Sequence, residues 1–402
     1  MSGIGLKTQI MYNKIIAIGP VMRKNSNLFS GQSMMFQLFV DELKDKKIDV
    51  LIVDINSTFA KSRTSGKFSF LRGLEYFFIL MKVFFTLGFN YRQYLYITTA
   101  QSRVGFYRDF FIINMAELFG YKIIAHQFGA NYNEFYKSQP EMLRKAIRRT
   151  LEKSEFIVVE GEFSKMQFNF IENFETKVVP IENGLPERNL KASGTGKTYE
   201  QLSPFNLFYL SNMIESKGYL DVLDAANILV NDHKKNIKCV FAGKFMSSVD
   251  DTLFSSATEA QESFFKFIET NKLNSSITYF PGLEGNQKAD YFLNSHIFLL
   301  PSYYLNEGQP VSVLEAMAYG VVPVVTKYRM IPLMVTEQTG FFVQPRNSAE
   351  IVRVILYLMN NPGKYAEFSQ ACTDRYKENF TRQKYVQKLL ELFNQLPHPK
   401  KI

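Results

Sequence analysis

Strand-like runs of apolar residues alternate along the chain with longer segments in which apolar residues recur every three or four positions. Apolar runs of about four to eight residues are typical of strands buried on both faces, and the longer periodic segments are typical of amphipathic helices. In the first half the strand-like runs are Lys14–Ile18, Asp49–Asp54, Tyr94–Thr98, Tyr121–Ala125 and Phe156–Glu160. This alternation predicts an α/β protein built on parallel sheets.

The clearest unit of this pattern lies in the second half of the chain. The apolar run Ile297–Leu300 predicts a strand, and Pro301 ends it. A helix is expected from Pro310, which suits a first helical position, to Gly320, which suits the left-handed position past a helix end. Val321–Val325 predicts the next strand. Together these elements form a parallel crossover unit, whose loop lies at the carboxyl end of a strand, where open α/β sheets bind ligands.

Two carboxylates frame that loop. Glu307 lies before the expected helix and Glu315 lies inside it. Between them, Val311, Ser312 and Val313 would expose N–H groups of the first turn, and such a helix start binds a diphosphate readily. Carboxylates accept hydrogen bonds from hydroxyl groups, so the pattern suits a nucleotide sugar, which has ribose, diphosphate and hexose. The alternative for either glutamate alone is a solvated surface position.

Length and composition indicate a soluble globular protein. The chain has 402 residues, enough for two core-bearing domains, and it is 46% hydrophobic and 21% charged. Its two cysteines, Cys239 and Cys372, cannot form a disulfide framework, which favours a reducing cytoplasm. The first apolar run, Ile15–Ile18, is too short for a signal peptide, and the most apolar window, Tyr76–Phe89, is shorter than the roughly 20 residues of a spanning helix. We therefore expect a cytoplasmic protein that is not integral to a membrane.

Positive charge and aromatic residues suggest two kinds of partner. The net charge is +9, and the chain contains 38 Phe and 22 Tyr but no Trp. Such a protein could meet nucleic acid or an anionic membrane, and no nucleic-acid motif is present. The Phe-rich stretch Phe68–Asn90 is either a buried helix of the first domain or a surface that dips into the bilayer interface. A second basic cluster, at residues 144–149, lies on a predicted helix and could also meet anionic lipid.

The framed loop also carries a family resemblance. Residues Glu307–Gly320 read E-G-x-P-x-x-x-x-E-A-M-A-x-G, which resembles the E-x7-E signature of retaining glycosyltransferases and, more narrowly, of glycosyltransferase family four. Members of that family have the GT-B fold, in which two Rossmann-like domains carry parallel sheets that face each other across a cleft. The resemblance implies that Glu307 holds donor-sugar hydroxyls and that Glu315 holds the ribose hydroxyls. It also implies that the intervening residues bind the donor, namely Gly308, Gln309, Pro310, Val311 and Ser312.

A second segment with the same resemblance supplies a cation. Ser211–Gly218 is similar to the family segment G-R-L-x-x-x-K-G, and Lys217 stands where the family lysine pairs with the donor diphosphate. The resemblance implies a reaction without a metal ion or other cofactor, so this cation would neutralise the leaving nucleoside diphosphate. Asn212 replaces the family arginine and donates hydrogen bonds without a charge. The alternative for Lys217 is an ordinary exposed residue.

Three other residues match the donor site of the family less closely. His126 follows a first-domain strand, where the family histidine approaches the donor sugar, although a lone histidine there is often structural. Gly31 lies in a loop that is close to the donor phosphates in the family, but Ser30 replaces the first of the paired glycines. Around Leu283, relatives hold the nucleotide base through backbone contacts. Ile181–Leu185 resembles the hinge segment.

The predicted domain organisation follows from these matches. The segment 187–204 is rich in Gly, Ser, Thr and Lys and is the best candidate for a linker. It separates an N-terminal Rossmann-like acceptor domain at 1–186 from a C-terminal nucleotide-sugar donor domain at 205–378. The last helix, within 379–402, is expected to pack back on the N-terminal domain, as is common in GT-B folds.

The sequence thus predicts a retaining glycosyltransferase that takes a sugar from a nucleotide-diphosphate donor, expected to be a UDP-sugar. The acceptor is expected to be a lipid-diphosphate-linked glycan on the inner face of the cell membrane, in the synthesis of a surface polysaccharide. Three alternatives stay open. They are an enzyme with a soluble acceptor, a catalytically inactive nucleotide-sugar binding protein, which the uncharged Asn212 favours, and a nucleic-acid binder, which the two carboxylates disfavour because they repel phosphate.

Overall fold

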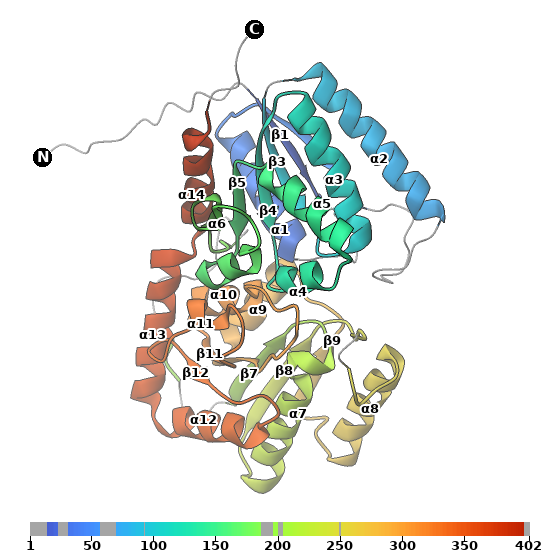
Figure 1. The fold of residues 1–402 in the computed structure, drawn as a ribbon. Coiled ribbons are helices and arrows are strands. Elements are labelled where there is room, and N and C mark those ends of the chain that lie inside the picture. The colour runs from blue at the N-terminus through green and yellow to red at the C-terminus, as the bar shows by residue number, and fades with distance from the viewer. Residues whose placement is uncertain are drawn as a thin grey trace, which may run out of the picture. The chain divides into compact units, whose positions relative to one another are not determined.

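Two parallel sheets of six strands each organise the residues that the structure describes (Figure 1). This computed structural model describes residues 14–22, 31–56, 70–91, 93–185, 196–199, 204–248 and 251–397. The chain divides into two units, and each unit contains one of the sheets. Unit 1 comprises Met1–Glu182 and Gln383–Ile402, and unit 2 comprises Asn183–Arg382.

The sheet of unit 1 has the strand order β2-β1-β3-β4-β5-β6, and its strand pairs are parallel. The order reverses between β1 and β3, which makes the sheet doubly wound. The strands are β1 (Ile15–Gly19), β2 (Val50–Asp54), β3 (Tyr94–Thr99), β4 (Lys122–Gln127), β5 (Phe156–Val159) and β6 (Val178–Pro180). The helices are α1 (Gly31–Asp45), α2 (Phe70–Phe89), α3 (Arg103–Leu118), α4 (Tyr132–Lys137), α5 (Glu141–Glu152), the 3₁₀ helix η1 (Glu162–Phe168), α6 (Phe174–Lys177) and α14 (Arg382–Gln395).

The sheet of unit 2 has the order β12-β11-β10-β7-β8-β9 and is also parallel. Its order reverses between β7 and β10, as in dinucleotide-binding folds. The strands are β7 (Phe205–Leu210), β8 (Ile237–Ala242), β9 (Ile277–Phe280), β10 (Ile297–Leu300), β11 (Val322–Val325) and β12 (Phe341–Phe342). The helices are η2 (Glu215–Lys217), α7 (Tyr219–Asn227), η3 (Ile228–Asp232), α8 (Ala257–Thr270), α9 (Gly285–Asn294), α10 (Val311–Ala318), α11 (Ile331–Met334), α12 (Ser348–Asn360) and α13 (Pro362–Asn379).

The crossover unit predicted in the second half is confirmed, with one correction. Every residue of β10 and β11 is buried, as expected for apolar strands that are covered on both faces. Gly320 has a φ of +66°, the left-handed conformation predicted for it. Pro310, however, is not the first helical residue. Its ψ is 114°, so it caps the helix in an extended conformation and α10 begins at Val311.

Part of the predicted linker is packed against unit 2. Residues 186–195 and 200–203 lie outside the described residues, but 196–199 are described. The Lys197 Nζ donates to the carbonyl oxygens of Phe292 (2.6 Å) and Ser295 (2.7 Å), and burial lowers the pKa of Lys197 to about 7. The backbone N–H of Gly196 donates to Gln370 Oε1 at 2.7 Å. These four residues therefore belong structurally to unit 2.

Helix α14 completes unit 1, although it comes from the far end of the chain. The Phe393 ring lies 5.9 Å from that of Phe39 on α1 and 6.2 Å from that of Tyr94 on β3, measured between ring centroids. Lys388 Nζ lies 2.5 Å from a carboxylate oxygen of Glu182. Apolar burial of this kind usually dominates the stability that a helix adds. Unit 1 is therefore assembled from two distant parts of the sequence.

We predict that Phe393→Ala destabilises unit 1 strongly. The side chain is 1% exposed, and truncating a buried Phe costs about 3–5 kcal/mol because the lost contacts leave a cavity. Thermal and urea unfolding monitored by circular dichroism would measure the loss. Phe265→Ala on α8 is the matched control, because Phe265 is 42% exposed. Equal stability of the two variants would contradict the assignment of α14 to the core of unit 1.

Candidate functional site

The strand order of unit 2 indicates where this unit can bind a ligand. β7 and β10 are neighbours, and the chain leaves them toward opposite sides of the sheet. A crevice forms outside the carboxyl ends of strands at such a reversal. The loop after β7 leads to η2 and Lys217, and the loop after β10 leads through Glu307 to α10. The two segments singled out in the sequence therefore lie at the same edge of one sheet.

A glycine allows the two loops to touch. Gly218 has a φ of +80°, and a Cβ at this position would lie 2.5 Å from the carbonyl oxygen of Pro301. Since that atom belongs to the backbone, only glycine fits here without moving one of the loops. The backbone N–H of Tyr303 then donates to the Ser216 carbonyl at 2.8 Å, which ties the loops together.

Lys217 and Glu307 form a direct ion pair at this point. The Lys217 Nζ lies 2.7 Å from each carboxylate oxygen of Glu307, and the Ser302 hydroxyl donates to Glu307 Oε2. The two side chains are 13% and 4% exposed. The Lys217 ammonium also lies 4.6 Å from the centre of the Tyr304 ring. Each charge is therefore neutralised where solvent reaches it poorly, as buried charges require.

The start of α10 lies between the two glutamates, as predicted. The N–H groups of Val311 and Ser312 have no partner within the helix, because they belong to its first turn. The expectation that the Val313 N–H is also exposed is wrong, since it donates to the Pro310 carbonyl at 3.0 Å. The reason is that Pro310 caps the helix and its carbonyl accepts the first turn's hydrogen bond. Two N–H groups, rather than three, are left for an anion.

Glu315 has a partner that the sequence analysis missed. The Lys288 Nζ on α9 donates to Glu315 Oε1, and the side chains are 14% and 4% exposed. The sequence does contain a signal for this partner. Lys288 lies one helical turn before the buried Phe292 and therefore on the inward-facing side of its helix. A lysine on such a side needs a buried carboxylate or a ligand nearby.

Gln309 forms hydrogen bonds within the protein. Its Oε1 accepts from the backbone N–H of Asn183 at 2.5 Å, and its carbonyl accepts from the Asn183 side-chain amide at 3.4 Å. Asn183 lies in the segment that resembles the family hinge, so Gln309 ties that segment to the α10 loop. The Nε2 of Gln309 is buried without a hydrogen-bond partner among the described residues.

The other predicted donor-site residues of unit 2 differ in what they offer. Asn212 is exposed, and its carbonyl accepts from Ile214 N–H at 2.9 Å. Leu283 is 7% exposed and packs in the core of unit 2, so only its backbone could meet a nucleotide. Gly308 is half-buried within the loop after β10.

Two predicted site residues belong to unit 1. Gly31 is the exposed first residue of α1. His126 lies inside β4, not after it, and its ring is fully buried and stacks on Phe128 with 4.1 Å between centroids. His126 Nδ1 shares a hydrogen bond of 2.7 Å with the Tyr96 hydroxyl, and burial lowers the pKa of His126 to about 3. The imidazole is therefore neutral, and its Nε2 has no hydrogen-bond partner in the described part of the chain.

Metal ligands are a separate question. In the described ranges, no group of three or more His, Cys, Asp or Glu side chains is placed to hold a metal ion. The charged groups of the unit 2 site are instead two lysines and two glutamates, which form the pairs Lys217–Glu307 and Lys288–Glu315. Such a set can exchange protein partners for an anion and for hydroxyl groups.

We predict that Lys288→Met destabilises unit 2, because it removes the ammonium that neutralises the buried Glu315 carboxylate. Removing one partner of a buried pair costs about 3–5 kcal/mol, whereas replacing both partners by apolar residues is often neutral. Lys288→Met combined with Glu315→Leu should therefore recover most of the lost stability in urea unfolding. Lys266→Met, on the exposed side of α8, is the control. A double variant as unstable as the single one would contradict this account of the pair.

A second prediction concerns acid stability. Since the pKa of His126 is about 3 in the folded chain and about 6.5 when unfolded, the unfolded chain binds an extra proton between these values. Stability should therefore fall on acidification through this window, by up to about 1.4 kcal/mol per pH unit. Urea unfolding measures this effect. Between about pH 6 and pH 4, the free energy of unfolding of His126→Gln should fall less steeply than that of the unmodified protein. His296, whose pKa burial lowers to about 4, adds a fall of the same sign in both proteins.

The control for this titration is His233→Gln, because His233 is exposed. It should leave the pH dependence of unfolding unchanged. If His126→Gln and the unmodified protein lost stability in parallel on acidification, the neutral, buried state of His126 would be contradicted.

Comparison with known proteins agrees with this geometry. Residues 197–375 match the family model described as "Glycosyl transferases group 1". An uncharacterised glycosyltransferase of Haemophilus influenzae is 30% identical over 115 residues, which is 28% of this chain and 31% of that protein. One of Methanocaldococcus jannaschii is 25% identical over 250 residues, which is 61% of this chain and 59% of that protein. The chain thus matches less than two thirds of the length of either relative.

Solved structures resemble the whole chain. Anabaena HepE, whose structure was solved in complex with UDP, has a TM-score of 0.68 and 13% identity, with 95% of this chain and 100% of that chain covered. HepE was also solved with UDP-glucose. The two six-stranded parallel sheets with their helices match these neighbours and confirm the predicted α/β, GT-B fold. Residues 197–375 are thus similar to a glycosyltransferase domain, and the likeness to HepE shows the fold.

Proposed function

We propose that unit 2 binds a nucleotide-diphosphate sugar and that the protein transfers the sugar, with retention of configuration, to a glycan acceptor. The observation that carries this proposal is the Lys217–Glu307 pair beside the start of α10. A cation and two helix N–H groups suit a diphosphate, and Glu307 and Glu315 on either side of them suit hydroxyl groups.

In this proposal, donor binding exchanges the partners of Lys217. The ammonium pairs with the diphosphate, which adds to the attraction of the Val311 and Ser312 N–H groups. Glu307 is then free to accept hydrogen bonds from the hydroxyls of the donor sugar. As the sugar leaves, negative charge grows on the diphosphate, and a preorganised cation and helix start stabilise that charge. The chemistry thus relies on positioning and electrostatics.

Glu315 and Lys288 would hold the other end of the donor. Glu315 is proposed to accept from the ribose hydroxyls, while Lys288 holds the carboxylate in place. Around Leu283 the backbone is proposed to contact the base. A UDP-sugar is the proposed donor, because HepE was solved with UDP and with UDP-glucose. The leaving diphosphate itself is proposed to take the proton of the acceptor hydroxyl, without a metal ion.

The roles of the unit 1 residues follow from the resemblance to glycosyltransferase family four. His126 is proposed to contact the donor sugar through its unpaired Nε2, and Gly31 to lie near the phosphates. The acceptor is proposed to be a lipid-diphosphate-linked glycan in the synthesis of a surface polysaccharide, at the inner face of the membrane. A soluble acceptor is the alternative within the enzyme class, and it would leave transfer independent of vesicles.

Isothermal titration calorimetry tests the donor site. With UDP, GDP, ADP and CDP in EDTA, we expect UDP to bind best, and added Mg²⁺ to change its affinity little. Lys217→Ala and Glu315→Ala should each weaken UDP binding by about 10- to 100-fold, because hydrogen bonds to charged groups contribute about 1.5–3 kcal/mol. The matched controls are Lys266→Ala and Glu262→Ala, both exposed on α8.

The outcomes separate the candidate functions. Binding of no nucleotide, or unchanged affinity in Lys217→Ala, would overturn the proposed site. Release of UDP from UDP-glucose in the presence of an acceptor would distinguish an enzyme from a binding protein. Tight binding without turnover for every acceptor would favour the inactive binding protein that the uncharged Asn212 suggests.

A further inference from the structure

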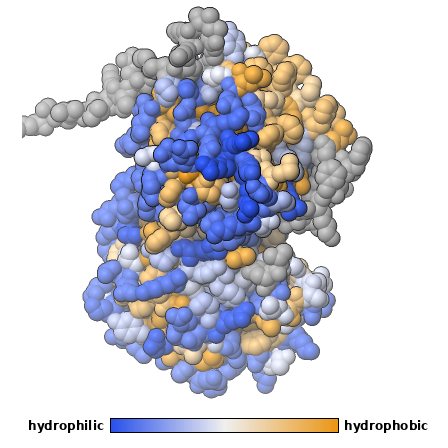
Figure 2. Space-filling model, in the orientation of Figure 1, coloured by the Kyte–Doolittle hydropathy of each residue, from blue (hydrophilic) through white to orange (hydrophobic). Residues whose placement is uncertain are grey.

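Helix α2 of unit 1 presents a broad apolar face to solvent. Figure 2 shows it as a patch of hydrophobic surface over α2. The large apolar side chains of α2 that are between 38% and 81% exposed are Leu74, Phe77, Phe78, Met81, Phe84, Phe85 and Phe89. Exposed apolar patches of this extent are rare on monomeric proteins and mark interaction sites. No helix in the described part of the chain is long and apolar enough to cross a membrane.

The opposite side of α2 holds the helix on the protein. Val83 and Leu87 are fully buried in the core of unit 1, and Ile79 and Leu80 pack against it. The Tyr121 hydroxyl also donates to the Leu87 carbonyl at 3.1 Å. Because this side already packs α2 against unit 1, the exposed phenylalanines are not needed to hold the helix on the core. The sequence left two alternatives open for this stretch, a buried helix and a surface that dips into the bilayer interface. In the structure, α2 has one buried side and one exposed apolar side.

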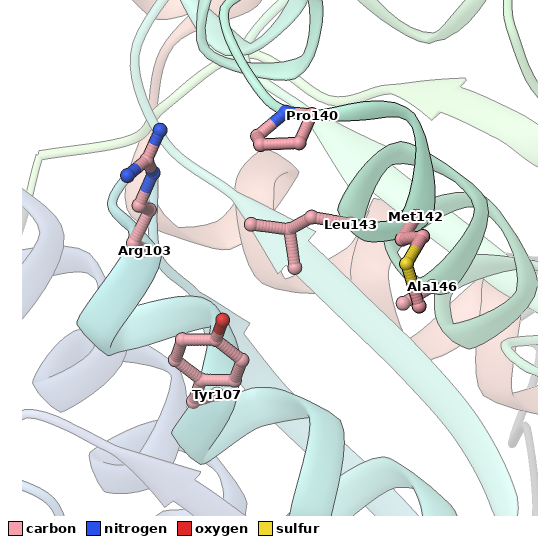
Figure 3. A pocket seen from close by; sticks show the side chains of 6 residues that line it. All are labelled: Arg103, Tyr107, Pro140, Met142, Leu143 and Ala146. Carbon is pink, nitrogen blue, oxygen red and sulfur yellow. The ribbon is translucent and has the colours of Figure 1, made fainter.

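The apolar surface continues onto the neighbouring helix. On α3, Tyr107, Phe111 and Leu118 recur along one stripe and are 51%, 50% and 80% exposed. The Phe84 ring lies 5.7 Å from that of Phe119, between centroids, which joins the two helices. At the other end of this stripe is a hollow of about 300 Å³ between α3 and α5 (Figure 3). Its lining residues are Arg103, Tyr107, Pro140, Met142, Leu143 and Ala146.

The charges on this surface are positive. Lys82 is exposed in the middle of the α2 face, with Phe78 and Phe85 one turn to either side. Arg103 is exposed at the hollow, and Figure 3 shows its side chain among those that line it. The acidic residues of α2 and α3 do not offset this positive charge. Glu75 and Asp109 are buried, and Glu117 forms an ion pair with Lys153.

We propose that this α2–α3 face docks onto an anionic lipid bilayer. Aromatic side chains on an interfacial helix insert between the headgroups and the acyl chains, while lysine and arginine reach the lipid phosphates. A second copy of the chain fits less well. A symmetric contact through this face would bring its cations together without exposed carboxylates on the described parts of α2 to pair with them. The bilayer supplies both an apolar layer and a layer of negative charge.

This docking involves unit 1 alone and does not depend on nucleotide binding by unit 2. It would hold the full-length protein at the membrane as a peripheral protein. A lipid-linked glycan acceptor would then be met by diffusion in two dimensions. The inference therefore supports the proposed acceptor, but it can fail while the proposed donor site holds.

Vesicle co-sedimentation of the full-length protein tests the proposal. We expect binding to vesicles that contain phosphatidylglycerol, and much weaker binding to pure phosphatidylcholine. Phe78→Ser combined with Phe85→Ser should weaken binding by at least roughly tenfold, because the two changes remove apolar surface that the bilayer would bury. Lys82→Glu should weaken binding to the anionic vesicles selectively, and most at low salt.

The controls remove equally exposed side chains elsewhere. Phe163→Ser on η1 with Phe265→Ser on α8, and Lys266→Glu, should leave vesicle binding unchanged. UDP affinity, measured by calorimetry, should be the same in all of these variants. Failure of the unmodified protein to bind anionic vesicles at low salt, or equal binding by the α2 variants, would overturn the proposal. A dimer in light scattering that the α2 variants dissociate, without vesicle binding, would assign the face to a second copy instead.

Discussion

The buried ion pair between Lys217 and Glu307 is the contact on which the geometry of the unit 2 site depends. It joins the loop after β7 to the loop after β10 at the point where the strand order of the sheet reverses. Gly218 makes the contact possible, because any other residue would collide with Pro301. Buried pairs contribute little net stability, so this one is better explained as a device that fixes geometry. It holds a cation and a carboxylate beside the start of α10, where they can exchange partners with a ligand.

The chemistry of the site follows from this arrangement. Each lysine of unit 2's site is matched to one glutamate, so that the site holds two neutral pairs: Lys217 with Glu307 and Lys288 with Glu315. An anion that displaces Glu307 from Lys217 frees a carboxylate at the same moment. A ligand with both a diphosphate and hydroxyl groups satisfies the cation and the carboxylate together. This accounts in physical terms for why carboxylates frame a phosphate site, which would otherwise repel its ligand.

Much of this could be predicted from the sequence where local rules decide. The strands β10 and β11, the left-handed Gly320 and the placement of Glu307 and Glu315 around α10 follow from apolar runs and from the demands of Pro and Gly. The pairing of side chains could not be predicted, because it depends on which loops the sheet topology brings together. Lys288 was missed for this reason. The Val313 N–H was misjudged because the cap conformation of Pro310, and not its ring alone, decides where the helical hydrogen bonds begin.

In unit 1, the sequence could not predict which side of the Phe-rich helix is exposed. Apolar periodicity identified the Phe-rich helix, but it could not separate the face that packs, with Val83 and Leu87, from the face that stays exposed, with Phe78 and Phe85. Both faces are apolar, so the usual contrast between an inward and an outward side is absent. His126 was placed just after its strand and lies within it, where burial keeps its ring neutral.

The central claim is that Lys217 changes partners when a nucleoside diphosphate binds. A crystal structure of the protein with UDP tests this most directly. The account predicts that the Lys217 Nζ lies within hydrogen-bond distance of the diphosphate, that the Ser312 N–H points at the same anion, and that Glu315 contacts the ribose hydroxyls. A structure in which Lys217 stays on Glu307 while UDP binds elsewhere on unit 2 would contradict it.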